Sequence, residues 1–379
     1  MANPVRRPLH ARLLLAGSLS LVLATTASSQ ESTDPALADA ERMPRAVKTL
    51  LTSVAQVGDG LVAVGERGHV LLSEDGLAWT QPEVVPTRSA LTAVAVQNTS
   101  VWAVGHDGII LHSADAGRTW DRQRADPRPP DSFDPDQGRP LLDVLFVDEQ
   151  RGWAIGAYSL LLETGDAGQT WRQRDLLALE STDEVIADPA AAGGAAAGQD
   201  DGEGEVSDGW LFNEDELELE AEENPHLNAI ARTPGGRLLV AGERGAAFRS
   251  LDDGVTWERL QLPYEGSMFG VLTWGEERAL LFGLRGNVLE THDFGATWQT
   301  VDSGTEASLM GGHALADGGA VLVGAEGRVV VRVNGDAAFE VTTYANEDGE
   351  TPILADVLPQ ADGGYLVVGE RGVGRHSPK

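Results

Sequence analysis

The chain contains the eight residues Ser113-Ala-Asp-Ala-Gly-Arg-Thr-Trp120, and close copies of them recur along its length. The shared pattern is Ser/Thr-x-Asp-x-Gly-x-Thr-Trp, a turn motif known as the Asp box. Complete copies also run from Thr164 to Trp171, from Ser250 to Trp257 and from Thr291 to Trp298. In such a turn the Asp side chain accepts backbone N–H bonds, the Gly permits a positive φ, and the Trp packs between neighbouring layers. The motif therefore predicts a repeated turn between two strands.

The Asp boxes are part of a longer repeat, in which an apolar stretch closes on a glycine before the box. Seven such glycines follow one another: Gly65, Gly105, Gly156, Gly242, Gly283, Gly324 and Gly369. Their spacing is 40 to 45 residues where nothing is inserted, and two intervals are longer. A repeat of this length predicts seven similar structural units.

Each unit is predicted to form four short strands. In the first unit, the stretches rich in alternating apolar residues are Leu51–Val57, Leu61–Val64, His69–Ser73 and Trp79–Glu83. Gly and Asp residues separate these stretches, as expected for tight turns between strands. Four antiparallel strands in every 40 to 45 residues are typical of a propeller blade. We therefore predict an all-β fold, a seven-bladed β-propeller with four-stranded antiparallel blades.

The last two units depart from this pattern. In the sixth unit the box has decayed to Asn334, Asp336 and Phe339, and the seventh unit ends after three strands. A ring of blades must close, because otherwise two strand edges stay exposed. The segment Met43–Leu50 is extended in character and has no unit of its own. We predict that it supplies the missing outer strand of the last blade, so that the N-terminal strand closes the ring.

The N-terminal residues have the features of an export signal. Arg6, Arg7 and Arg12 provide a positive end, and the apolar stretch Leu13–Ala24 is too short to span a bilayer as a helix. We expect the mature protein in the periplasm, without insertion into the membrane; an uncleaved anchor is the alternative. The predicted organisation is a signal peptide at residues 1–29, a linker at 30–42 and a propeller at 43–379 with an acidic insertion at 176–225.

Charge and cysteine content exclude several kinds of function. Acidic residues outnumber Lys and Arg by 59 to 28 in the 379 residues, which gives a formal net charge of −31. Such a chain repels phosphate backbones, and this excludes nucleic acid as a partner. The absence of cysteine excludes disulfides, thiolate zinc sites, iron–sulfur clusters and cysteine nucleophiles. No motif predicts a metal or another cofactor.

Asp boxes also occur in sialidases, so a hydrolase or glycan-binding protein of that type is one alternative. The sialidase reaction needs three arginines on the substrate carboxylate, a tyrosine nucleophile polarised by a glutamate, and an acidic aspartate. The chain has only four tyrosines, and it lacks the Phe/Tyr-Arg-Ile-Pro motif that carries the first of those arginines. We therefore predict no catalytic residues.

The turn between the second and third predicted strands carries arginine in four of the seven units. These residues are Arg67, Arg244, Arg285 and Arg371. In a propeller such turns share one face with the links between blades. Guanidinium groups gathered there would bind carboxylates or an acidic peptide bidentately. The alternative is that each arginine pairs with its neighbouring glutamate or with the adjacent blade.

The predicted insertion at residues 176–225 lies in one of these links, and it contains 16 acidic residues and no basic residue. Its second part also contains apolar side chains, among them Trp210 and Phe212. Two interpretations stay open: the insertion docks on the arginine face or on a partner, or it is a solvated loop.

Together these features resemble the photosystem II stability/assembly factor family, over about residues 45–377. The resemblance rests on seven units with Gly-x-x-Gly turns, Asp boxes that end in Thr-Trp, an export signal and the blade opening Asn224-Pro-His-Leu-Asn-Ala229. It implies a non-catalytic propeller that assists the assembly of a membrane protein complex, with the four turn arginines as partner-binding residues. An accessory role for an efflux-type inner-membrane transporter is the alternative, and we expect a monomer.

Overall fold

The computed structural model describes residues 34–129, 131–132, 134, 136–174, 176 and 224–378. The chain divides into two units, Met1–Ser32 and Thr33–Lys379, and every described residue lies in the second. The predicted signal peptide and nearly all of the predicted acidic insertion therefore lie outside the described residues. Within the described part, no helix has the length and apolar character needed to cross a bilayer.

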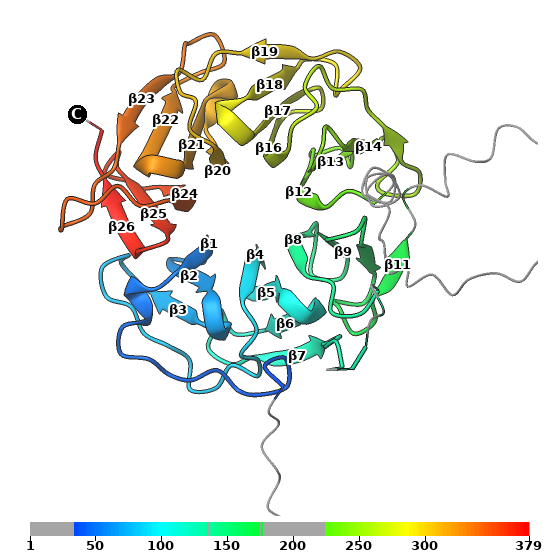
Figure 1. Cartoon of the computed structure of the whole chain (residues 1–379), viewed down its shortest axis with the longest axis vertical. Coiled ribbons are helices and arrows are strands. Elements are labelled where there is room, and N and C mark those ends of the chain that lie inside the picture. The colour runs from blue at the N-terminus through cyan, green and yellow to red at the C-terminus, as the bar shows by residue number, and fades with distance from the viewer. Residues whose placement is uncertain are drawn as a thin grey trace, which may run out of the picture. The chain divides into compact units, whose positions relative to one another are not determined.

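Seven antiparallel sheets follow one another around a ring in the second unit (Figure 1). In each sheet the strands run outward from the axis in chain order, so that the first strand of every sheet is the innermost. Five sheets have four strands, while the first and the last have three. The predicted seven-bladed β-propeller is confirmed.

Every sheet has an innermost, a second and a third strand, counted outward from the axis. The innermost strands are β1 (Leu51–Val57), β4 (Leu91–Gln97), β8 (Leu141–Phe146), β12 (Leu227–Arg232), β16 (Met268–Trp274), β20 (Leu309–Ala314) and β24 (Leu354–Pro359). The second strands are β2 (Gly60–Gly65), β5 (Ser100–Gly105), β9 (Gly152–Gly156), β13 (Leu238–Gly242), β17 (Arg278–Gly283), β21 (Ala320–Gly324) and β25 (Tyr365–Gly369). The third strands are β3 (Val70–Ser73), β6 (Ile110–Ser113), β10 (Leu161–Thr164), β14 (Ala247–Ser250), β18 (Val288–Thr291), β22 (Arg328–Arg332) and β26 (Gly372–His376).

The outer strands are β7 (Asp121–Arg124), β11 (Arg172–Arg174), β15 (Glu258–Arg259), β19 (Gln299–Val301) and β23 (Glu340–Thr343). Short 3-10 turns complete the described elements: η1 (Ala46–Lys48), η2 (Glu66–Gly68), η3 (His106–Gly108), η5 (Leu284–Gly286), η6 (Ala316–Gly318) and η7 (Ala325–Gly327).

The second strand of each sheet forms the core. Every residue of β9 and of β25 is buried, because neighbouring sheets cover both faces of the strand. Its sequence is therefore continuously apolar instead of alternating. Between the second and third sheets, for example, the rings of Trp102 and Phe146 stack with centroids 3.6 Å apart.

The Asp boxes form the turns between third and outer strands. In the second sheet, Asp115 accepts hydrogen bonds from the backbone N–H and the hydroxyl of Thr119, and the Gly117 N–H donates to Ser113 Oγ at 2.8 Å. Equivalent bonds in the fifth sheet, from the Thr297 hydroxyl and N–H, lower the pKa of Asp293 to about 2. The carboxylates are thus ionised, and each one holds its turn together.

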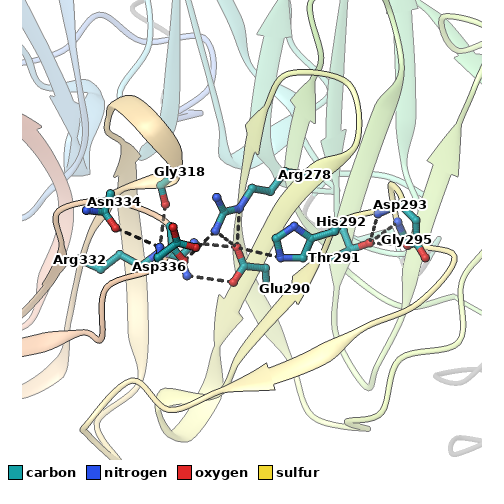
Figure 2. A network of polar contacts seen from close by, with 11 residues as sticks. Arg278, Glu290, Thr291, His292, Asp293, Gly295, Gly318, Arg332, Asn334 and Asp336 are labelled. Atoms are coloured by element: carbon teal, nitrogen blue, oxygen red, sulfur yellow. Dashed lines mark hydrogen bonds and ion pairs between the residues drawn. The ribbon is translucent and has the colours of Figure 1, made fainter.

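At the decayed sixth box, a buried ion-pair network joins the fifth and sixth sheets (Figure 2). Arg332 stands where the other boxes have Ser or Thr, and it donates to both carboxylate oxygens of Glu290 at 2.9 Å. Arg278 donates to the same carboxylate from Nε at 2.7 Å. Desolvation alone would raise the pKa of Glu290, but the bonds from Arg332 and Arg278 lower it. The Arg332 guanidinium also lies 5.0 Å from the centre of the Phe339 ring.

Replacing Glu290 with Ala should lower the free energy of unfolding by about 3–5 kcal/mol, because the buried charge of Arg332 would lose its carboxylate. The matched control is Glu163→Ala, one residue before the third-sheet box, where the partner Arg174 is exposed. There the expected loss is about 0–1 kcal/mol. Chemical denaturation of both variants checks this, and equal losses would contradict it.

The ring closes at its innermost strands, where β24 lies against β1. Asp356 Oδ2 accepts hydrogen bonds from Val54 N at 2.9 Å and from Ser53 Oγ at 3.1 Å. Asp143 makes the equivalent contact between the third and fourth sheets, with its Oδ2 2.9 Å from Ile230 N. Near the axis, the Asp356 carboxylate thus bridges the seventh and first sheets, and the Asp143 carboxylate bridges the third and fourth.

Both bridging carboxyl groups are partly buried, and their pKa values are raised. Desolvation, with a smaller contribution from the charge of Asp356, raises the pKa of Asp143 to about 7, against the backbone bonds that it accepts. Desolvation likewise raises the pKa of Asp356 to about 6. An unfolded Asp titrates near pH 4, so the folded protein binds more protons between about pH 4 and 7. Stability contributed by these groups therefore falls as the pH rises through that window.

The variant Asp143→Asn should flatten this pH dependence, since the amide carries no charge. Its single oxygen can keep only one of the two backbone N–H bonds, from Ile230 and from Val144, that the carboxylate accepts. We therefore expect its free energy of unfolding, relative to that of the wild type, to rise by about 1–3 kcal/mol between pH 4 and pH 8. Thermal melts between pH 4 and 8 provide the measurement. Parallel curves for the two proteins would show that Asp143 does not titrate as described.

The prediction that Met43–Leu50 supplies the outer strand of the last blade is wrong. Residues 44–48 form turns instead, with η1 at Ala46–Lys48, and the Thr49 N–H and hydroxyl both donate to Ala46 O. These local bonds, together with Pro44, which has no N–H, prevent the segment from forming a strand. The segment still packs beside β26. Val47 O lies so close to Gly372 that a Cβ on this glycine would collide with it.

Candidate partner-binding face

The four predicted arginines occupy equivalent turns between the second and third strands. Because the sheets are antiparallel and the strands run outward in the same order, these turns all lie on one face of the ring. Arg67, Arg244 and Arg285 have positive φ angles of 56°, 51° and 56°. A left-handed backbone costs an ordinary L-residue about 1–2 kcal/mol. In the shorter turn of the seventh sheet the positive φ falls on Gly372 instead of Arg371.

The other sheets have similar turns between their second and third strands, but the residue at the arginine position differs in charge. Asp107, Tyr158 and Glu326 occupy the same position in the second, third and sixth sheets, also with positive φ. The arginines therefore form two adjacent pairs, one on the fourth and fifth sheets and one on the seventh and first. We call the turns of all seven sheets, together with the links between sheets, the arginine face.

Three of the four guanidinium groups have no partner among the residues that the structure describes. Arg67, Arg244 and Arg285 are exposed, and their side chains make no hydrogen bond or ion pair there. The glutamate beside Arg244 faces His226 instead, with Glu243 Oε1 3.5 Å from its Nδ1. Pairing with a neighbouring glutamate, the alternative interpretation, therefore does not hold for these three.

Arg371 differs from the other three. Its Nε lies 3.1 Å from Glu350 Oε2, and both side chains are about half exposed. An ion pair this exposed contributes little to stability and exchanges readily with another carboxylate.

Two exposed apolar residues lie beside the arginines of the seventh and first sheets. Leu50 is 39% exposed and Ile353 is 45% exposed. The Glu66 N–H donates to Leu50 O, and the Glu370 N–H donates to Ile353 O, so each apolar residue adjoins an arginine turn. The arginine face thus combines positive charge with apolar surface.

The chain returns from the insertion onto the same face. Pro225 O accepts the Ser159 N–H bond at 2.9 Å, and the rings of His226 and Tyr158 meet edge to face with centroids 5.0 Å apart. Residues 177–223 lie outside the described residues, so both interpretations of the insertion, docking and a solvated loop, stay open.

Comparison with known proteins gives the chain a family context. A family model described as "Photosynthesis system II assembly factor YCF48" matches residues 46–137 and 132–191, which is less than half of the chain. The photosystem II assembly lipoprotein Ycf48 of Prochlorococcus marinus is 54% identical over 35 residues, 9% of this chain and 10% of that protein. The photosystem II assembly protein Ycf48 of Thermosynechococcus vestitus is 46% identical over 37 residues, 10% of this chain and 11% of that protein. The chain therefore matches only about a tenth of the length of these curated relatives.

Solved structures extend the similarity to the whole ring. A structure titled "YCF48 bound to D1 peptide" has a TM-score of 0.59 at 14% identity, covering 92% of this chain and 100% of that one. YCF48 from Cyanidioschyzon merolae has a TM-score of 0.59 at 12% identity, with 89% and 98% covered. The chain is thus a seven-bladed propeller that is similar to photosystem II assembly factors in fold and, over part of its length, in sequence. The propeller domain of Doa1, with a TM-score of 0.57 at 12% identity over 91% of this chain and 97% of that one, shows that structural likeness at this level establishes the fold alone.

The sequence predicted the arginine turns but not their apolar neighbours. These neighbours could have been found in the sequence, because the residue directly before the innermost strand is large and apolar at Leu50 and Ile353. The fifth and sixth units have Ser267 and Ser308 there. Among the described residues, no group of three or more His, Asp or Glu side chains is placed to hold a metal ion.

Proposed function

We propose that this chain is an exported, non-catalytic scaffold whose arginine face binds a membrane protein complex during its assembly. The observation that carries the proposal is the set of three exposed guanidinium groups on one face of the ring, for which the described residues supply no partner. The names of the relatives support it, since they are assembly factors, and one relative has been solved with a D1 peptide bound.

The chemistry of the arginine face favours a partner segment with carboxylates and apolar side chains. Guanidinium binds carboxylate through two parallel N–H···O bonds, which gives orientation as well as affinity. Leu50 and Ile353 add apolar surface beside the arginine turns of the first and seventh sheets.

The net charge of −31 shapes how such binding proceeds. A strongly acidic protein repels an acidic partner at long range, so the arginine face must act through close, desolvated contacts. Salt screens the long-range repulsion more than the close pairs. We therefore propose that the face selects its partner by local fit, without fast electrostatic steering.

The proposed location is the periplasm. The predicted signal peptide at residues 1–29 supports export, and two relatives from Prochlorococcus marinus are named lipoproteins. A scaffold there would reach a membrane complex from its exported side.

Reversing the charge of Arg244 and Arg285 together should reduce binding of the membrane complex at least tenfold, because a charge-assisted hydrogen bond contributes about 1.5–3 kcal/mol. Crosslinking to native membranes, with mass spectrometry of the captured subunits, compares Arg244→Glu/Arg285→Glu with the wild type. The matched control, Arg118→Glu/Arg259→Glu, makes the same charge change at two exposed arginines away from the face. If both double variants capture the same subunits equally well, the arginine face is not the binding site.

A further inference from the structure

The seventh sheet has an open edge. Five sheets end in an outer strand, and in the first sheet Leu72 of β3 forms a two-way backbone bridge with Thr80. Among the described residues, no strand or bridge covers the outer side of β26, which lies at the seam beside the first sheet (Figure 1).

The backbone of Arg375 is directed toward this open edge. The strand registers place Arg375 opposite Leu366 and Leu72 opposite Val62, and both partners precede the closing glycine of their strand by three residues. Leu72 exchanges hydrogen bonds of 2.8 and 2.9 Å with Thr80 on its outer side. Backbone groups alternate in direction along an antiparallel strand. Arg375 therefore presents its N–H and C=O on the outer side of β26, just as Leu72 presents its own toward Thr80 on the outer side of β3.

A groove of about 670 Å³ lies where the outer strand would run. Val373, Gly374 and Arg375 of β26 line one side of it. Lys48 and Trp79 line it from the N-terminal segment and the first sheet, and Tyr344 lines it from the sixth. The groove is therefore next to the unpaired edge. Its walls are partly apolar and carry charges of both signs, with Lys48, Arg371 and Arg375 near the edge and Glu347, Asp348 and Glu350 on the link from the sixth sheet.

The other sheets indicate which strand would fit. In the second, fourth and sixth sheets, an acidic residue of the outer strand stands directly opposite the position that Arg375 occupies. The pairs are His112 with Asp121, Arg249 with Glu258 and Val331 with Glu340. In the fourth sheet this pair is an ion pair of 2.9 Å.

An acidic strand would complete the charge pairing of the seventh sheet. The present partner of Arg375 is Asp362 in a neighbouring turn, and this ion pair is exposed at both ends. Such a pair is weak, so Arg375 remains available to a carboxylate placed on the open edge.

We propose that the outer edge of β26 binds an extended acidic segment of a partner polypeptide, which adds as the fourth strand of the seventh sheet. Main-chain hydrogen bonds to the edge would supply affinity, and a carboxylate opposite Arg375 would supply specificity. This site adjoins the arginine face, because Arg371 and Glu350 also line the groove. The proposal rests on the open edge of β26 and not on the function proposed for that face.

The test uses a fluorescent peptide that copies Phe339–Tyr344, whose Glu340 would face Arg375. With the full chain, fluorescence anisotropy should show saturable binding, which Arg375→Glu weakens at least tenfold and Arg118→Glu leaves unchanged. A second peptide with Lys in place of its Glu should bind the wild type poorly and recover on Arg375→Glu. Because Arg375 is exposed, its replacement is not expected to unfold the protein.

Hydrogen exchange locates the bound peptide. The backbone amides of Val373 and Arg375 should gain protection, while the turns of Arg244 and Arg285 should not. Three outcomes would overturn the proposal: no charge dependence at Arg375, loss of binding in Arg244→Glu/Arg285→Glu, or a dimer of the free chain that Arg375→Glu dissociates. The last would mean that a second copy occupies the edge.

Discussion

The contact between β24 and β1 is the constraint on which the rest of the structure depends. All seven sheets pack in sequence, and this contact, together with those of β25 with β1 and of β26 with η1, joins the end of the described chain to its beginning. Asp356 bridges it through Val54 and Ser53, and this replaces the strand exchange that the sequence suggested. The closed ring aligns seven equivalent turns, so that arginines separated by more than 300 residues in the chain share one face.

Within the ring, local hydrogen bonds hold the turns, and contacts between side chains hold neighbouring sheets together. The Asp boxes are held by bonds among residues at most four positions apart, so they form independently of their neighbours. The sheets are then joined by contacts such as the stacked Trp102 and Phe146, or the network of Glu290 and Arg332. In the sixth turn Asn334 Oδ1 accepts the backbone N–H bonds of Asp336 and Ala337 in place of an Asp carboxylate. Arg332 there binds Glu290 of the neighbouring sheet.

The fold could be predicted because its signals are local and repeated. The seven glycines are spaced regularly since each closes a strand against the preceding link; a Cβ on Gly65 would collide with Leu50 O, and one on Gly105 with Ala90 O. The closing segment could not be predicted, because its extended character was overridden by bonds from Thr49 to Ala46. Nor could the sequence show that Arg67, Arg244 and Arg285 find no partner among the described residues. Glu243, for example, stands next to Arg244 in the chain but faces His226 in the structure.

The central claim is that these three guanidinium groups form a carboxylate-binding face. Side-chain NMR of arginine-labelled protein, titrated with hexaglutamate, tests it most directly. The Nε–H signals of Arg67, Arg244 and Arg285 should shift together and saturate, while that of Arg332, already bound to Glu290, should stay fixed. Uniform small shifts of all exposed arginines, or none at all, would contradict the claim.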